Sequence, residues 1–150
     1  MSYSIRKYNR KFQSESFRDQ TKKVVDVLIV AGYDGTLPEK FYKVITSTKS
    51  GVDIRVDGYG RSNTAYLEKF LEWDNSKGAK TSTVTYWKTV ADANTNKKLI
   101  PFAIDPFGGY FAVDVTTKGF EGIVFVSGEH SDESVYEILL DDILNSLSIK

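Results

Sequence analysis

Residues 99–114, LIPFAIDPFGGYFAVD, carry the strongest structural signal in this chain of 150 residues. Two apolar runs, 99–105 and 110–115, are joined by Pro106-Phe107-Gly108-Gly109. Short apolar runs around a Gly-rich connection of this length are typical of a β-hairpin. Residues 123–126 form a further run of apolar residues and predict another strand of the same meander.

The segments before this hairpin predict helices and one strand. Apolar residues recur at helical spacing over 16–31, which predicts a helix. A second helix is predicted to begin within TLPE at 36–39, which combines a capping box with a proline in the first turn. Apolar and charged residues alternate over 52–57, the pattern of a half-buried strand.

Further elements complete the predicted fold. We expect a short helix over 64–73, a strand over the β-branched segment 81–90, a polar loop over 91–98 and a last helix over 132–147. The last helix would bury Tyr136, Leu139, Leu140, Ile143, Leu144 and Leu147. The sequence therefore predicts an α+β fold, an antiparallel β-meander packed with N-terminal and C-terminal helices. The length fits a single domain over 1–150, with 1–15 as a candidate basic arm.

Composition argues against most common catalytic machinery. The chain has no Cys and one His, so a thiolate zinc site, a cysteine nucleophile and a His-pair metal site are excluded. Its 20 basic and 20 acidic residues cancel. The formal charge is nevertheless +5 over residues 1–50, +2 over 51–100 and −7 over 101–150. Such asymmetry bears on partners rather than on fold. We expect no enzyme activity, no metal and no cofactor.

The sequence predicts a cytoplasmic protein without a membrane segment. No apolar run follows the N-terminal charges, so the start does not resemble a secretory signal. The longest apolar run, 27–31, is far shorter than the ~20 residues that a spanning helix needs.

Two acidic residues flank the central hairpin. Asp105 and Asp114 are a carboxylate pair that could do acid–base chemistry if their environments differed. An Asp beside Gly and Pro more often holds a turn, and that interpretation is favoured here.

The single histidine and a Gly-rich turn are the other catalytic or ligand candidates. His130 is a conceivable general base, but Ser131 and Asp132 beside it are more typical of a helix cap. Residues 58–63, GYGRSN, precede the helix predicted over 64–73 and are a weak anion-site candidate. The third glycine of a dinucleotide fingerprint is absent, so a tight turn is favoured.

The basic N-terminal segment and the acidic C-terminal segment suggest different partners. Aromatic residues interleave with Lys and Arg in the first segment, as in nucleic-acid binding, but the neutral whole makes nucleic acid an unlikely partner. The segment 129–142 contains no Lys or Arg and carries Glu129, Asp132, Glu133, Glu137, Asp141 and Asp142. It is either the solvated face of a helix or a surface for a basic protein.

Residues 99–105 and 108–114 resemble the central signature of the Smi1/Knr4 (SUKH) superfamily, an IPFA-x-D strand, a Gly-rich turn and a second strand ending in Asp. LPEKFY at 37–42 is similar to that family's LP-x-x-(Phe/Tyr) helix start, and the layout after Glu129 is similar to its C-terminal part. A basic segment stands in place of the family's acidic N-terminal helix. The resemblance covers roughly 36–147 and is that of a divergent member.

The resemblance implies a non-catalytic protein-binding domain. Bacterial members are commonly cytoplasmic immunity proteins that neutralise a toxin, often a nuclease. We expect an acidic surface to occlude a basic toxin domain, with aromatic anchors inside a charged rim. The candidate partner-binding residues are Asp105, Phe107, Tyr110, Asp114, Glu133 and Glu137. Two alternatives stay open, an assembly protein that uses its basic arm for subunit contacts and a hydrolase that uses His130.

Overall fold

The computed structural model describes residues 15–33, 35, 37–45, 50–58, 61–73, 81–116, 122–130 and 134–147. Its helices are α2 (Glu15–Val30), α3 (Glu39–Ile45), α4 (Val84–Asn94) and α5 (Leu140–Ser146). Its strands are β1 (Val52–Gly58), β2 (Arg61–Leu67), β3 (Lys69–Phe70), β4 (Leu99–Ile104), β5 (Tyr110–Asp114), β6 (Gly122–Val126) and β7 (Val135–Ile138). The fold is α+β, as predicted.

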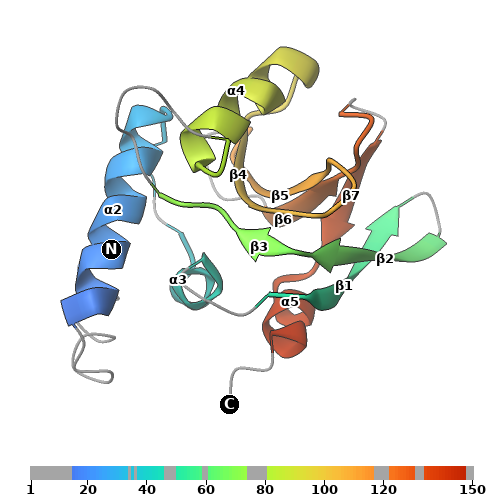
Figure 1. Ribbon diagram of the computed structural model, residues 1–150, viewed down its shortest axis with the longest axis horizontal. Helices are drawn as coiled ribbons and strands as arrows, with labels where there is room; N and C mark the ends of the chain where they lie inside the picture. The colour runs from blue at the N-terminus through green and yellow to red at the C-terminus, as the bar shows by residue number, and fades with distance from the viewer. Residues whose placement is uncertain are drawn as a thin grey trace.

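The strands form one antiparallel sheet in the order β2-β1-β7-β6-β5-β4-β3 (Figure 1). The predicted meander β4-β5-β6 is confirmed and supplies three consecutive neighbours in this order. Val113 of β5 lies opposite Ile100 of β4 and Ile123 of β6. Pro101 lies within β4 beside a shift in the pairing register, where the ladder tolerates a residue that cannot donate a hydrogen bond.

The two edge strands of the sheet are consecutive in the chain. Only Glu68 separates β2 from β3, and its backbone N–H donates to the carbonyl oxygen of Ile104 at 2.8 Å. One stretch of chain therefore pairs with β1 along its first part and with β4 along its second part. The sheet is strongly curved, so that its two edges approach each other at this residue (Figure 1).

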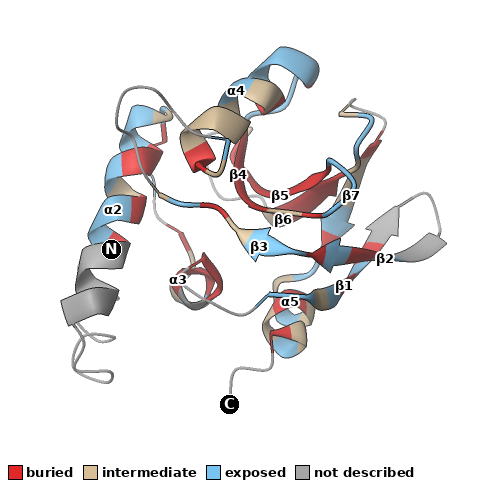
Figure 2. Cartoon of the chain, in the orientation of Figure 1, coloured by how far each residue is buried: buried red, intermediate tan, exposed pale blue. Residues whose placement is uncertain are grey.

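Side chains that alternate along the strands build a separate core on each face of the sheet. Phe111 and Val113 of β5 join the larger core with residues of α2, α3 and α5. Tyr110 and Ala112 point the other way and pack with Ala91 of α4. Because both faces are covered, β4, β5 and β6 are buried along almost their whole length (Figure 2). The period-2 geometry of a strand explains why one short segment serves two cores.

The two predicted N-terminal helices are confirmed. In α2, Val24, Val27 and Leu28 are buried at helical spacing, whereas Lys22 and Lys23 are exposed. Helix α3 follows Pro38 and places Phe41 edge-on against Phe102 of β4, with 5.3 Å between the ring centroids.

The helix predicted over 64–73 is wrong, because this segment forms β2 and β3. Ala65 and Leu67 are buried while Thr64 and Tyr66 are exposed, so burial follows a period of two. The apolar residues of the segment also fit a helical stripe, and pairing with β1 decides between the two periods.

The strand predicted over 81–90 is also wrong, because residues 84–94 form α4. Thr83 caps this helix, and its Oγ1 accepts the backbone N–H of Tyr86 at 3.2 Å. Val84 and Ala91 are buried seven positions apart, which is two helical turns. Packing on the sheet thus overrides the strand preference of the β-branched residues.

The last helix is shorter than predicted. Residues 135–138 form β7, which fills the place between β6 and β1, and only residues 140–146 are helical. Leu139, expected in the helix's buried stripe, is 64% exposed where strand gives way to helix. Ile143 and Leu147 are buried as predicted. Ser131 and Asp132, the proposed cap, lie outside the described residues.

Candidate functional site

Two turns lie side by side at one end of the sheet. Tyr110 at the start of β5 is paired with Val126 at the end of β6, so the β4–β5 turn and the chain leaving β6 are neighbours. We call residues 105–109 and 127–130 together the paired turns. The N-terminal half of α4 lies at the same end of the strands, because Trp87 of that helix contacts Tyr110 and His130.

Asp105 holds the first of the paired turns. Its Oδ1 accepts the backbone N–H of Phe107 at 3.1 Å and that of Gly109 at 2.6 Å. Its own N–H donates to the Gly109 carbonyl oxygen at 3.1 Å. The turn-forming interpretation of Asp105 is confirmed, and its buried carboxylate is committed to the backbone.

The paired turns are in direct backbone contact. A Cβ placed on Gly109 would lie 2.6 Å from the Val126 carbonyl oxygen, and one on Gly128 would lie 2.6 Å from the Phe107 carbonyl oxygen. Gly108 has φ +89°, a conformation that other residues rarely adopt. The glycines of LIPFAIDPFGG thus permit both the turn and the close approach.

His130 joins the two turns through its side chain. Its Nε2 lies 2.5 Å from the Gly108 carbonyl oxygen, and because a carbonyl only accepts, Nε2 carries the donated proton. The residue has φ +56°, and its backbone N–H donates to the Ser127 carbonyl oxygen at 2.9 Å.

Two aromatic side chains, Trp87 and Tyr110, pack against the imidazole of His130. The ring centroid of His130 lies 5.7 Å from that of Tyr110 and 6.2 Å from that of Trp87. Trp87 and Tyr110 are themselves 5.7 Å apart. The Trp87 indole N–H donates to the Thr81 carbonyl oxygen at 2.8 Å, which fixes the ring. The cluster is therefore a rigid base for the paired turns.

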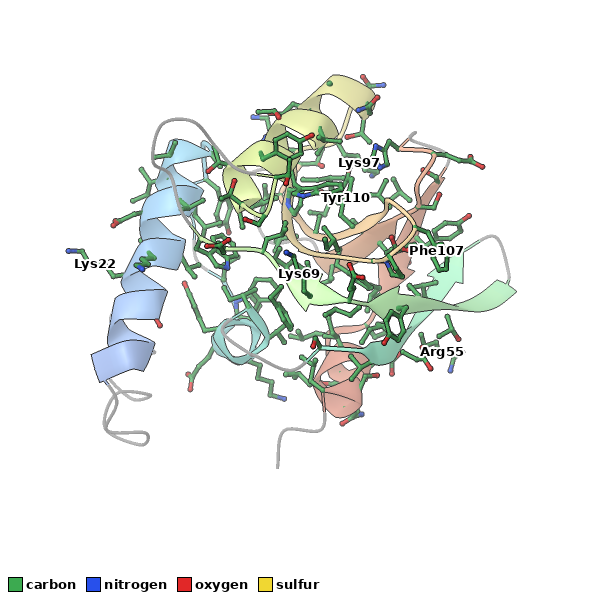
Figure 3. All side chains as sticks on the ribbon, in the orientation of Figure 1. Lys22, Arg55, Lys69, Lys97, Phe107 and Tyr110 are labelled. Carbon is green, nitrogen blue, oxygen red and sulfur yellow. The ribbon has the colours of Figure 1, made fainter. Side chains whose placement is uncertain are left out.

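Phe107 is the exposed tip of this arrangement (Figure 3). It is 82% exposed, more than any other large apolar side chain in the described part of the chain. Glu129 is also exposed and lies in the second of the paired turns. An apolar side chain held on a rigid turn, with a carboxylate nearby, can enter a pocket on another protein at low entropic cost.

The acidic surface predicted around the hairpin is wrong in part. Asp114 is buried at the opposite end of β5, about 13 Å from Tyr110 at the usual rise of a strand. Its Oδ1 accepts the Thr116 N–H at 3.0 Å, and its Oδ2 is 3.8 Å from Lys97 Nζ. Asp105 and Asp114 therefore serve separate turns and do not form a patch.

The remaining predicted site residues divide between surface and core. Tyr110 is fully buried, so it supports the site from inside and is wrong as an anchor. Phe107 is exposed as expected. Glu137 is exposed on β7, opposite Val124 of β6 and Asp57 of β1. Glu133 lies outside the described residues.

The predicted helix start after GYGRSN is absent. Gly58 of β1 pairs with Arg61 of β2, so the segment turns a hairpin, and no helix N-terminus follows it to bind an anion. The turn itself, at Tyr59 and Gly60, lies outside the described residues, so the tight-turn interpretation stays a prediction.

Sequence reasoning missed the supporting roles of Trp87 and His130. Trp87 falls in the strand that the sequence predicts over 81–90, and the sequence around His130 suggests only a base beside a helix cap. The contacts of both residues cross between segments far apart in the chain, and a single sequence carries no signal for that. In the residues that the structure describes, no group of three or more His, Cys, Asp or Glu side chains could hold a metal ion.

Comparisons with known proteins leave the family open. No family model matches the chain, and searches of curated proteins and of solved structures gave no significant match. The resemblance to the SUKH superfamily therefore stays a prediction. None of the helices described has both the length and the apolar character needed to cross a bilayer.

Proposed function

We propose that this chain is a non-catalytic protein-binding domain of the SUKH type that works as a cytoplasmic immunity protein. It neutralises a cognate toxin by covering a functional face of the toxin. The observation that carries the proposal is the rigid presentation of Phe107, which is 82% exposed. A large apolar side chain in water is unfavourable for the free protein and is typical of an interface anchor.

The surroundings of Phe107 favour a basic partner. Glu129 is exposed in the paired turns and Glu137 is exposed on β7. The C-terminal third of the sequence carries a formal charge of −7. Exposed acidic groups in the paired turns and on β7 attract a positively charged face, such as the substrate-binding face of a nuclease. This surface replaces the one predicted around Asp105 and Asp114.

The arrangement of His130 argues against hydrolase chemistry at this site. Its Nε2 donates to a backbone carbonyl, and two aromatic rings pack against the imidazole. With Nε2 donating, Nδ1 is the nitrogen that could act as a general base, and no described residue is hydrogen-bonded to it as a nucleophile would be. We therefore assign His130 the role of positioning the paired turns.

The test is neutralisation of a toxin domain encoded beside this gene. We expect co-expression of the chain to restore growth of cells that produce the toxin, and the Phe107→Ala variant to lose that protection. Loss of one interface anchor typically lowers affinity by about 2 kcal/mol or more, roughly 30-fold. Calorimetric titration of the purified toxin domain measures this directly.

Val30→Ala is the matched control, because Val30 is 65% exposed and lies on α2, away from the paired turns. It should bind and protect as the unaltered chain does. Equal protection by the Phe107→Ala variant would reject the paired turns as the interface. Failure of the unaltered chain to bind the toxin domain would reject the immunity function.

A further inference from the structure

The sheet face that carries α4 is covered over only part of its width. Val124 and Val126 of β6 are buried in the core that includes α4, and Val135 of β7 packs against them. The same face continues to Glu137 of β7, which lies opposite Val124 on one side and Asp57 of β1 on the other. Val135 is half-buried, whereas Glu137 is exposed. The cover over this face therefore ends within β7.

Strands β1 and β2 leave the same face open. Arg55 lies on this side of β1, two residues before the residue paired with β7, and it is exposed. Its neighbours Ile54 and Val56 are buried in the larger core on the other side (Figure 2). Tyr66 of β2 lies opposite Asp53 of β1, and both are exposed. Side chains on this part of the sheet thus alternate between core and solvent.

Two large apolar side chains are exposed on this open part. Tyr66 is 41% exposed and Leu139 is 64% exposed. Leu139 follows β7 with φ −77° and ψ 135°, so its backbone is still extended, and the buried Ile138 separates it from Glu137. Its side chain therefore lies on the same side as that of Glu137. We define the open face by the exposed side chains on this side of β1, β2 and the end of β7: Asp53, Arg55, Thr64, Tyr66, Glu137 and Leu139.

Carboxylates predominate at the open face. Asp53 and Glu137 belong to it, and the exposed Asp141 lies two residues after Leu139 in the first turn of α5. These described side chains carry three negative charges against the positive charge of Arg55. Aromatic residues and Arg are enriched in protein interfaces, and an excess of carboxylates favours a basic partner.

We propose that the open face binds an amphipathic helix of a partner protein. The helix places apolar side chains on Tyr66 and Leu139 and basic side chains beside the carboxylates. A helix is the element that covers the rest of this face, where Ala91 of α4 is buried against the sheet. A partner helix on the open face extends that layer, as layered packing of helices on a sheet requires. Neither Tyr66 nor Leu139 belongs to the paired turns, so this is a second binding surface.

A helix-stabilised synthetic peptide tests the proposal, with leucines at helical spacing and lysines on both flanks of the leucine stripe. Calorimetric titration should show binding to the unaltered chain that weakens as salt is raised. The same peptide with glutamates in place of the lysines should bind at least about tenfold more weakly.

The Tyr66→Ala, Leu139→Ala double variant removes the two apolar contacts. Both side chains are exposed, so the variant should fold, and it should bind the lysine peptide at least about tenfold more weakly. Ile29→Ala, Val30→Ala is the matched control, because these side chains of α2 are 57% and 65% exposed. The control should bind the peptide as the unaltered chain does.

Hydroxyl-radical footprinting locates the peptide on the unaltered chain without any variant. Tyr66 and Leu139 should become protected from oxidation when the lysine peptide is added, whereas Ile29 and Phe107 should not. Protection confined to Phe107 would place the peptide on the paired turns and would overturn the proposal.

The remaining outcomes are also decisive. No binding of the lysine peptide at about 1 mM would overturn the proposal, and so would binding that the Tyr66→Ala, Leu139→Ala variant leaves unchanged. Protection of Tyr66 and Leu139 that rises with the concentration of the chain alone would make a second copy the occupant and would overturn it as well. None of these measurements uses the toxin, so the two proposals can fail separately.

Discussion

Gly128 is a residue at which the paired turns leave no room for a side chain, since an added Cβ would lie 2.6 Å from the Phe107 carbonyl oxygen. The obstructing atom belongs to the backbone, so relief requires one turn to move. We expect Gly128→Ala to lower the free energy of unfolding by about 2 kcal/mol, the usual cost of overpacking. The shift should also displace Phe107 and weaken toxin binding.

Gly32→Ala separates this steric effect from the general cost of replacing a glycine. Gly32 has φ +92° and its added Cβ would contact nothing within 4 Å, so only backbone strain of about 1 kcal/mol is expected there. Urea denaturation of the two variants and of the unaltered chain measures the difference. If Gly128→Ala is no more destabilising than Gly32→Ala, the turns are not in rigid contact.

At the scale of single elements, α4 depends on Thr83 for its start. The Thr83 hydroxyl caps the helix, and the Val84 N–H donates to the Glu72 carbonyl oxygen at 2.9 Å. We expect Thr83→Ala to lower the free energy of unfolding by about 1 kcal/mol, typical of a lost N-cap. Thr83→Ser keeps the capping oxygen and should cost less. Equal losses in thermal or urea unfolding would contradict the capping role.

The elements also show which parts of the fold can be predicted from a single sequence. The meander was predictable because Phe111, Val113 and Ile123 lie in short apolar runs separated by turn residues. The strands in segment 64–73 were not predictable, because its apolar residues fit both a helical period and a strand period of two. Pairing with β1 decides in favour of the strand. Segment 84–94 has strand-like composition but lies against β4, where a helix buries Ala91 and Trp87 packs on the core. Local pattern fails where tertiary contacts choose between two acceptable conformations.

The candidate site was predictable to the same limited extent. Asp105 and Phe107 lie beside Gly and Pro, so a turn with an exposed tip follows from sequence. The burial of Tyr110 and Asp114 does not, because it depends on elements that cover both faces of β5, so that residues pointing to either side are buried. His130 reaches Gly108 across 22 positions, a contact that no local pattern contains.

At the scale of the whole molecule, charge asymmetry should control how fast the proposed basic partner binds. We expect the double variant Glu129→Lys, Glu137→Lys to reduce the association rate constant by about tenfold at low salt. The dependence of this rate on ionic strength should become weaker, while dissociation changes less. Stopped-flow mixing at several salt concentrations measures both rates.

Asp92→Lys and Asp26→Lys together are the matched control, since both aspartates are exposed on helices α4 and α2 and the net charge changes equally. Association rates that fall equally in both double variants would point to net charge alone. The positions of Glu129 and Glu137 would then have no separate role.

The stability of the whole fold should decrease at high pH because of Tyr42. This residue is 1% exposed in the larger core. Burial raises the pKa of Tyr42 to about 12, and the neighbouring Tyr33 adds to the effect. The phenol of an unfolded chain ionises at a pKa of about 10. Between these values the unfolded state releases a proton that the folded state keeps, so stability is full below pH ~10 and falls as pH rises toward ~12.

Tyr42→Phe removes this contribution together with the interaction between Tyr42 and Tyr33, and it leaves every other ionisable group in place. The difference in free energy of unfolding between the unaltered chain and the variant should shift by about 1 kcal/mol in favour of the variant between pH 9 and pH 11. Urea denaturation at pH 9, 10 and 11 measures that difference. Parallel stability curves over this range would contradict the prediction, because they would mean that the Tyr42 phenol ionises at the same pKa in the folded and the unfolded chain.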